Sequence, residues 1–257
     1  MTPVARLANH HSSGPLTGRV AGWLVCGCIA LTAAAARAAE EQPADKPASP
    51  STSAGVIADD FTQPLDKAWR WIREDRENWR TSSKGLQVLI EPGNMWGGAN
   101  DAKNVLVREI PVAWRDAVEI VAHVSHRPEK RWEQANLVWY YSDSTMVKLG
   151  LEVEHGKTNI VMGREEGDKT RTVKIVPYPH TAVVLRLRVV GGQIDGAFRR
   201  PDGEPQDWTE VGACKLPESP RAPTPCASLQ FYQGEAGSDR WATVSAFRMA
   251  KLKQAGD

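Results

Sequence analysis

The chain has 257 residues, enough for one or two domains, and its 32 Lys and Arg residues nearly balance 31 Asp and Glu residues. The formal charge of +1 excludes a strongly basic nucleic-acid-binding protein and an acidic disordered chain. The hydrophobic fraction of 41% supports a folded core and excludes a protein with many membrane spans. The 10 Trp residues outnumber the 4 Phe and 4 Tyr residues together, which indicates aromatic anchors in a core, stacking platforms on a surface, or both.

Residues 20–36 form an uncharged, mostly apolar run that follows two arginines and precedes the small-residue motif Ala36-Arg37-Ala38. This order predicts a secretory signal peptide over residues 1–38, and therefore a secreted or periplasmic protein with no membrane segment after cleavage. An uncleaved anchor is one alternative, although the run is short for a membrane span. A lipoprotein signal that ends at Cys28 is the other.

Residues 39–56 are rich in Pro, Ala and Ser and lack large apolar side chains. Such a segment cannot bury enough apolar surface to offset the entropy lost on ordering. We therefore expect a disordered linker at 39–56, a folded domain at 57–250 and a short tail at 251–257.

Cleavage after residue 38 would leave two cysteines, Cys214 and Cys226, on either side of a proline-rich segment. In an oxidising compartment an even number of cysteines predicts a disulfide. The alternative is two free thiols.

From residue 57 onward, apolar and polar residues alternate in short segments separated by turns that contain Gly, Asp or Pro. No window carries a helical stripe longer than two turns, and no repeat recurs at a fixed period. Alternation with one apolar face predicts an all-β, two-sheet antiparallel sandwich, in particular a jelly roll. The expected strands cover residues 86–90, 104–110, 117–126, 135–141, 146–154, 159–164, 170–176, 183–189, 193–199, 228–233 and 242–250.

Several segments resemble a known family in their order and spacing. They are DF at 60–61, WRW at 69–71, AKNVLVR at 102–108, QANLVWYY at 134–141, VKLGLE at 147–152 and VLRL at 184–187. Together they resemble the concanavalin A-like domain found at the C-terminus of β-xylosidases and as free-standing secreted proteins, over about residues 57–250. The resemblance implies a jelly roll of the lectin and glucanase type. In β-xylosidases this module accompanies a separate catalytic domain. The resemblance therefore implies a catalytic partner on another chain, and it does not imply that this chain has the xylosidase activity.

The polar face of the predicted sheet is the candidate carbohydrate-binding site. Sugars bind where an aromatic ring stacks on their C–H face and where charged or amide groups bond their hydroxyls. The alternative is that the charged residues form cross-strand ion pairs on a solvated sheet. Relative to the family, Asn136 replaces a common Gly and Met146 a larger aromatic residue. The predicted carbohydrate-binding residues are Asn136, Tyr140, Lys148, Glu152, Arg186, Arg188 and Trp96, with Tyr140 as the stacking ring and Trp96 as a rim platform.

The tryptophans divide into two expected groups outside the predicted signal peptide. Those in the segments that resemble the family are expected to be scaffold, because large aromatic side chains dominate buried area. Those near predicted loops are candidate surface platforms. The first group is Trp69, Trp71, Trp79 and Trp139; the second is Trp96, Trp114, Trp132 and Trp208, with Trp241 undecided.

A catalytic role would need paired carboxylates. Glu152 and Glu154 share one face of a strand, about 7 Å apart at Cα, which is compatible with acid–base work on a glycosidic bond. The middle Asp of the glucanase pattern Glu-x-Asp-x-Glu is missing, and Glu165 and Glu166 would point to opposite faces. We therefore predict a non-catalytic, lectin-like carbohydrate-binding module, with a glycoside hydrolase or a structural envelope module as alternatives.

The sequence predicts no metal site and no cofactor. His123 and His126 are three residues apart and would face opposite sides of a strand. Calcium would need clustered oxygens. Asp59, Asp60 and Asp101 could supply some of these, and the alternative is that they bond turns and caps.

Overall fold

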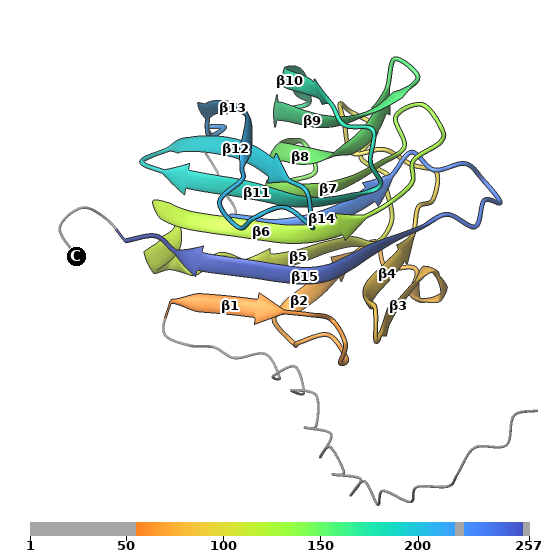
Figure 1. The fold of residues 1–257 in the computed structure, drawn as a ribbon, viewed down its shortest axis with the longest axis horizontal. Coiled ribbons are helices and arrows are strands. Elements are labelled where there is room, and N and C mark those ends of the chain that lie inside the picture. The colour runs from red at the N-terminus through yellow and green to blue at the C-terminus, as the bar shows by residue number, and fades with distance from the viewer. Residues whose placement is uncertain (1–54, 219–223, 254–257) are drawn as a thin grey trace, which may run out of the picture. The chain divides into compact units, whose positions relative to one another are not determined.

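The computed structural model describes residues 55–218 and 224–253 (Figure 1). Within these ranges the chain forms fifteen strands and two single-turn 3₁₀ helices, η1 (Arg76–Asn78) and η2 (Val112–Trp114). The strands build two antiparallel sheets, which confirms the all-β sandwich. None of the described helices is long and apolar enough to cross a membrane. The predicted signal peptide, the Cys28 alternative, nearly all of the predicted linker and the end of the tail lie outside the described residues.

The first sheet has eight strands in the order β13-β12-β11-β6-β15-β4-β3, with β1 paired to β15. The last long strand, β15, lies between β6 and β4 and joins early and late parts of the chain. The bounds are β1 (Val56–Asp59), β3 (Trp79–Ser82), β4 (Gly85–Leu89), β6 (Ala117–Ser125), β11 (Ala182–Val190), β12 (Gln193–Arg199), β13 (Thr209–Lys215) and β15 (Trp241–Lys251).

The second sheet has seven strands in the order β10-β9-β8-β7-β14-β5-β2. Here β14 is inserted between β7 and β5, as β15 is inserted in the other sheet. The bounds are β2 (Trp69–Ile72), β5 (Val105–Glu109), β7 (Gln134–Ser142), β8 (Thr145–Glu154), β9 (Lys157–Glu166), β10 (Lys169–Pro177) and β14 (Cys226–Tyr232).

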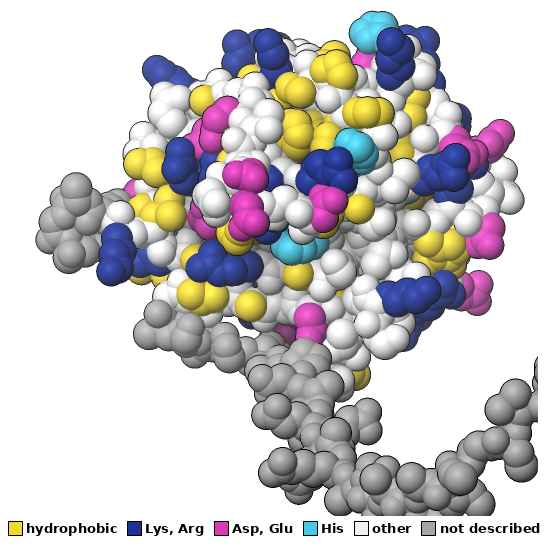
Figure 2. Space-filling model, viewed as in Figure 1, with side chains coloured by type: hydrophobic (Ala, Val, Ile, Leu, Met, Phe, Trp, Pro, Cys, Tyr) yellow, Lys and Arg dark blue, Asp and Glu magenta, His cyan; other side chains and the backbone are white. Residues whose placement is uncertain are grey.

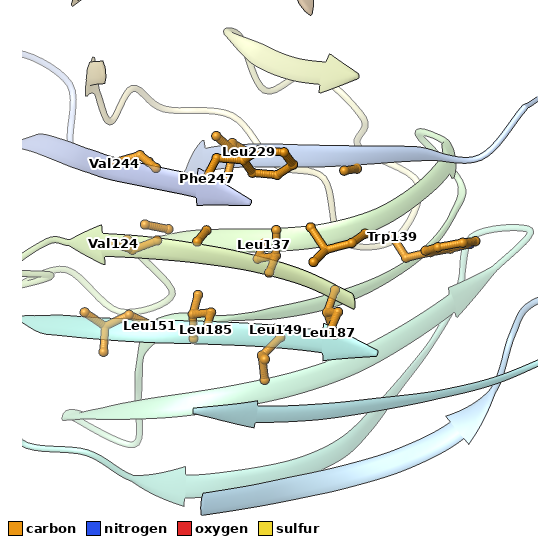
Figure 3. Packing of buried hydrophobic residues seen from close by; sticks show 14 of the residues in the cluster. Val124, Leu137, Trp139, Leu149, Leu151, Leu185, Leu187, Leu229, Val244 and Phe247 are labelled. Atoms are coloured by element: carbon orange, nitrogen blue, oxygen red, sulfur yellow. The ribbon is translucent and has the colours of Figure 1, made fainter. Parts of the chain in front are cut away.

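The main core lies between the two sheets. Alternate residues of each strand point inward, so Leu137 and Leu149 from one sheet meet Leu185 and Phe247 from the other (Figure 3). Truncating any of these buried side chains would cost about 2–5 kcal/mol. The inward faces predicted from the period-two pattern are therefore confirmed.

A second, smaller cluster lies on the outer face of the seven-stranded sheet, under the loop that joins β4 to β5. Met95 from this loop packs with Tyr140, Met146 and Tyr232 from the sheet. The loop is held by its own polar groups, because Asn94 Oδ1 accepts the backbone N–H groups of residues 95 and 96 at 2.9 and 3.0 Å. The loop covers part of this face and leaves the rest open.

The predicted disulfide is wrong, because Cys214 and Cys226 are both free and buried. Cys214 lies on β13 and packs in the main core, whereas Cys226 belongs to the second cluster on the outer face of the other sheet. The two side chains are therefore on different faces. Burial raises the pKa of each thiol, which keeps both thiols protonated.

The predicted scaffold role of four tryptophans is confirmed. Trp69 and Trp139 are buried, and the half-buried rings of Trp71 and Trp79 pack 4.9 Å apart against the core. Trp114, predicted as a surface platform, is half-buried and packs against the core. Trp241, left undecided, is half-buried, and its indole N–H donates to Asp239 Oδ1 at 2.6 Å.

Candidate functional site

A pocket of about 290 Å³ opens on the outer face of the seven-stranded sheet, beside the β4–β5 loop. Its floor comes from β7 to β10, and its rim comes from loops on either side. This volume corresponds to about ten water molecules, so the pocket can hold one small ring-shaped ligand group rather than an extended surface. The lining residues are Asn94, Trp96, Trp132, Gln134, Lys148, Glu152, Glu154, Val161, Thr172, Ile175 and Gln233.

The floor of the pocket is built around the buried ammonium group of Lys148. Its Nζ donates to Gln134 Oε1 at 2.6 Å and to Glu152 Oε2 at 2.9 Å. Gln134 and Glu152 are direct cross-strand partners on β7 and β8, and Lys148 is on the same face of β8, so the alternation brings all three together. A charge this deeply buried is tolerated because it is paired and hydrogen-bonded.

Asn136 extends this network below the pocket. Lys148 can only donate, so Gln134 must present its Oε1 to the ammonium, while its Nε2 donates to the backbone oxygen of Trp132 at 2.8 Å. Asn136 Nδ2 then donates to the same Oε1 at 3.1 Å. Its Oδ1 is left buried without a partner among the described residues. The group fits there because the facing residue is Gly150, whose added Cβ would collide with it.

Trp96 forms one wall of the pocket. Its ring lies against Gly163 of β9, where an added Cβ would collide with the indole, and the centre of the ring is 4.6 Å from Lys148 Nζ. This is a cation–π contact in a largely desolvated place. The next backbone N–H, that of Gly97, donates to Glu165 Oε1 at 3.1 Å and anchors the loop to β9.

Trp132 forms the opposite rim. Its side chain is 44% exposed, and its backbone has a φ of 68°, a left-handed conformation that is rare for a bulky residue. Conformations of this kind persist only where the surroundings impose them. The backbone is therefore held in one conformation here, while the indole stays open to solvent with the Arg131 guanidinium 4.3 Å from its centre.

The segment before Trp132 is braced by a fully buried carboxylate. Glu133 Oε2 accepts the backbone N–H of Lys130 at 3.0 Å, and Oε1 accepts Arg240 Nε at 2.8 Å and lies 3.3 Å from His126 Nε2. Burial alone would raise the pKa of Glu133, but the nearby His126 ring and the hydrogen bonds from Arg240 and the Lys130 N–H lower it to about 2. Glu133 therefore stays ionised and fixes the rim.

Glu165 is the second fully buried carboxyl at this site. Its Oε2 has no partner among the described residues, and burial raises its pKa to about 7, against the opposing effects of the Gly97 N–H and Lys148. It therefore titrates near neutral pH, directly under the loop that carries Trp96.

Four of the predicted site residues come together here. Trp96, Lys148 and Glu152 line the pocket, and Asn136 lies under its floor. Tyr140 shares their face of the sheet, but its ring is covered in the second cluster and its hydroxyl donates to Asp143 Oδ1 at 2.8 Å. The prediction that Tyr140 stacks on a sugar is therefore wrong.

The two predicted arginines lie elsewhere, which corrects their assignment to this face. Arg186 and Arg188 are on β11, in the other sheet. Arg186 pairs with Glu210 at 2.8 Å, and Arg188 pairs with Asp195 at 3.1 Å. Arg188 thus forms the cross-strand ion pair of the alternative, with its direct partner on β12, whereas Arg186 reaches past β12 to Glu210 of β13. Figure 2, in the orientation of Figure 1, likewise shows basic and acidic side chains interspersed rather than gathered in one patch.

Some lining residues were missed or placed in another role. Gln134 is two positions before Asn136, so the alternation already placed it on the right face. Asn94 and Gln233 come from loops, for which the sequence offers no comparable signal. Glu154 was weighed only as half of a catalytic pair, and it lines the same pocket as Glu152. Glu152 is bound to Lys148 in this arrangement.

The candidate calcium ligands accept hydrogen bonds from backbone N–H groups of their own turns and loop. Asp59 Oδ1 accepts the Phe61 N–H at 2.7 Å, Asp60 Oδ1 accepts the Thr62 N–H at 2.9 Å, and Asp101 Oδ1 accepts the Asn94 N–H at 2.8 Å. Within residues 55–218 and 224–253 no three His, Cys, Asp or Glu side chains gather closely enough to hold a metal ion.

Comparison with known proteins agrees with this architecture. The family model described as the beta-xylosidase C-terminal concanavalin A-like domain matches residues 58–218. No curated protein matches the chain.

Solved structures show the same fold at low sequence identity. The GH43 protein BlXynB from Bacillus licheniformis has a TM-score of 0.66 and 18% identity, covering 76% of this chain and 39% of that one. Xylan beta-1,4-xylosidase from Bacillus halodurans has a TM-score of 0.65 and 17% identity, with coverages of 80% and 41%. A functionally unknown protein from Saccharomyces cerevisiae has a TM-score of 0.51 and 11% identity, with coverages of 72% and 95%. The chain thus spans about two fifths of the length of the two bacterial proteins.

Proposed function

Because the chain belongs to the family of β-xylosidase C-terminal concanavalin A-like domains, we propose that it binds carbohydrate without hydrolysing it. The binding site is the pocket on the outer face of the seven-stranded sheet. The observation that carries the proposal is this pocket, in which two tryptophans flank a buried, hydrogen-bonded ion pair.

The two indoles supply the apolar part of recognition. A sugar ring presents C–H groups on one face, and these stack on aromatic side chains. Trp96 is fixed by its packing on Gly163, and Trp132 is fixed by the braced segment before it. Rigid platforms lose little entropy when a ligand binds.

The floor supplies the polar part. Glu152 is 6% exposed. One oxygen of its carboxylate accepts a hydrogen bond from Lys148, and the other has no hydrogen bond among the described residues. Glu154 also lines the pocket, with its Oε2 buried. Carboxylate oxygens that face a pocket accept hydrogen bonds from sugar hydroxyls.

The proposal extends to the context of the chain. The bacterial structures that share its fold include one named a xylan β-1,4-xylosidase, in which this fold makes up less than half of the protein. Export of this chain and a catalytic partner on a separate chain would fit a module that holds a polysaccharide near an enzyme. Cell fractionation tests the first point, and finding the chain only in the cytoplasm would contradict it.

Calorimetric titration of the full chain with xylotriose and cellotriose tests the binding itself. We expect saturable binding that Trp132→Ala weakens by about fivefold or more, because a stacked aromatic pair contributes about 1 kcal/mol beyond its buried area. Trp208→Ala is the matched control, since Trp208 packs beside Arg186 on the other sheet and should leave the affinity unchanged.

Two results would contradict the proposal: no saturable binding of either sugar at millimolar concentration, or equal weakening by both substitutions. The same samples, assayed for new reducing ends, test the alternative of hydrolysis. Hydrolysis would require two carboxylates, and Glu152 and Glu154 are the pair in this pocket.

A further inference from the structure

The pocket is lined by more negative than positive side chains. One cation and two carboxylates line it: Lys148, Glu152 and Glu154. Which of these charges remains available depends on what each already contacts inside the protein. That question decides which class of sugar the site accepts.

The cation is already occupied. Lys148 Nζ donates to Gln134 and to Glu152, and it also lies against the Trp96 ring. Its side chain is 3% exposed. A ligand anion would therefore have to displace an internal partner of Lys148, leaving a buried group of the protein unpaired.

The carboxylates retain free oxygens. Glu152 uses Oε2 for Lys148, and its Oε1 is not hydrogen-bonded within the described part of the chain. Glu154 Oε2 has no hydrogen-bond partner there and is buried. After the internal pair is formed, one full negative charge remains in the pocket.

Neighbouring groups do not reverse this sign. Basic residues near the lining residues in the chain include Arg131, whose guanidinium lies 4.3 Å from the centre of the Trp132 ring, and Lys130, whose Nζ donates to the backbone oxygen of Gly234 at 3.1 Å. Lys157, Arg171 and Lys174 are next to or near lining residues of β8 and β10. All five are exposed, and none of them lines the pocket. Their charges are therefore screened by solvent.

The uncharged side chains under the floor also leave acceptors, rather than donors, without a partner. Asn136 Oδ1 and Gln230 Oε1, from paired positions on β7 and β14, are both buried acceptors without a partner in the described ranges. The titratable carboxyl of Glu165 adds another buried oxygen without a partner in these ranges. The donors that the lining residues offer besides Lys148 are uncharged: the indole, amide and hydroxyl groups of Trp96, Trp132, Gln233 and Thr172 among them.

From this imbalance we propose that the pocket selects sugars by charge: it binds neutral and amino-bearing sugars and rejects sugars that carry a carboxylate, such as uronic acids. The inference rests on the proposed function and adds the class of ligand. A protonated amine gains from the carboxylate oxygens that have no partner inside the protein. A uronate meets an unpaired negative charge and an ammonium group that is already bonded.

The test compares β-1,4-linked trimers of glucose, glucosamine and glucuronic acid in calorimetric titrations of the full chain. The pH is set so that the amine is protonated and the uronate ionised. The glucosamine trimer should bind at least as tightly as the glucose trimer, and the glucuronate trimer about tenfold or more weakly than either.

A charge swap separates this selection from shape. Glu154→Gln keeps the size and an acceptor oxygen but removes the free charge, so the ratio of glucosamine to glucuronate affinities should fall by about tenfold. Glu119→Gln changes the net charge equally, but Glu119 pairs with Arg248 on the other sheet, so this control should keep the original ratio.

The outcomes distinguish the two claims. If the glucose trimer binds but the glucuronate trimer binds as tightly as the glucosamine trimer, the charge selection is wrong and the carbohydrate site stands. An unchanged ratio in Glu154→Gln also overturns the selection. If none of the three trimers binds, both claims fail together.

Discussion

The outer faces of the two sheets carry similar residues with different consequences. On the eight-stranded sheet, Arg188 pairs with Asp195 while its side chain is 43% exposed. On the seven-stranded sheet, Lys148 pairs with Glu152 with side chains only 3% and 8% exposed. An exposed pair contributes little to folding, whereas a buried one is costly to break. The difference arises from the loops, since the β4–β5 loop and the segment carrying Trp132 enclose only one of these faces.

Breaking each ion pair should separate the two faces most clearly. Lys148→Met leaves Glu152 buried without its cation and should destabilise the fold by about 3–5 kcal/mol. Arg188→Met removes a solvent-screened pair and should cost less than about 1 kcal/mol. Urea unfolding of both variants measures the two costs. Equal costs would show that the enclosure of Lys148 has no energetic consequence.

A second difference should appear as a pH dependence that originates at the enclosed face. The pKa of Glu165 is raised from its ordinary value of 4.5 to about 7 by burial. Its contribution to stability is therefore complete below pH 4.5 and is lost as the pH rises through 7. Because one pKa unit corresponds to about 1.4 kcal/mol, the loss amounts to at most about 3–4 kcal/mol.

Glu165→Gln tests this assignment, since the amide cannot ionise and its oxygen can still accept the Gly97 N–H. Denaturant unfolding between pH 4 and pH 8, in steps of about one unit, should show a fall in the wild type that is absent in the variant. A parallel fall in both proteins would place its origin elsewhere. Glu133 has the opposite sign, because its pKa is lowered to about 2, and it contributes to stability above pH 4.5.

The smallest perturbation concerns one wall of the pocket. Gly163→Ala places a Cβ where the Trp96 ring lies, so the ring must move away from Lys148. We expect a loss of stability of about 1–3 kcal/mol and weaker sugar binding. Gly98→Ala is the matched control in the same region, because a Cβ there meets no atom within 4 Å. Weakened binding in the control alone would contradict the placement of Trp96.

The alternation of residues predicted most of the fold and about half of the site. It placed Asn136, Lys148 and Glu152 correctly because β7 and β8 form a hairpin, in which neighbouring strands share a face by necessity. The short strands β1 and β3 and the Gly-containing β13 were missed, since four residues, or a strand with few large apolar side chains, give little periodic signal.

The errors share a physical reason. Period two tells which residues of a strand share a face, but not to which sheet the strand belongs, so Arg186 and Arg188 were assigned to the wrong sheet. The disulfide prediction rested on the number of cysteines in an oxidising compartment, which likewise does not tell on which sheet or face each residue lies, and Cys214 and Cys226 face different clusters. Tyr140 was on the right face, and only the path of the loop over it decides that its ring is covered.

The most direct test of the account is a crystal structure of the full chain with a bound neutral β-1,4-linked trisaccharide. The account predicts one sugar ring in the pocket between Trp96 and Trp132, with hydroxyls bonded to Glu152 and Glu154. A sugar bound beside Trp208 on the eight-stranded sheet would contradict it. So would an unoccupied pocket at a sugar concentration that saturates the protein in solution.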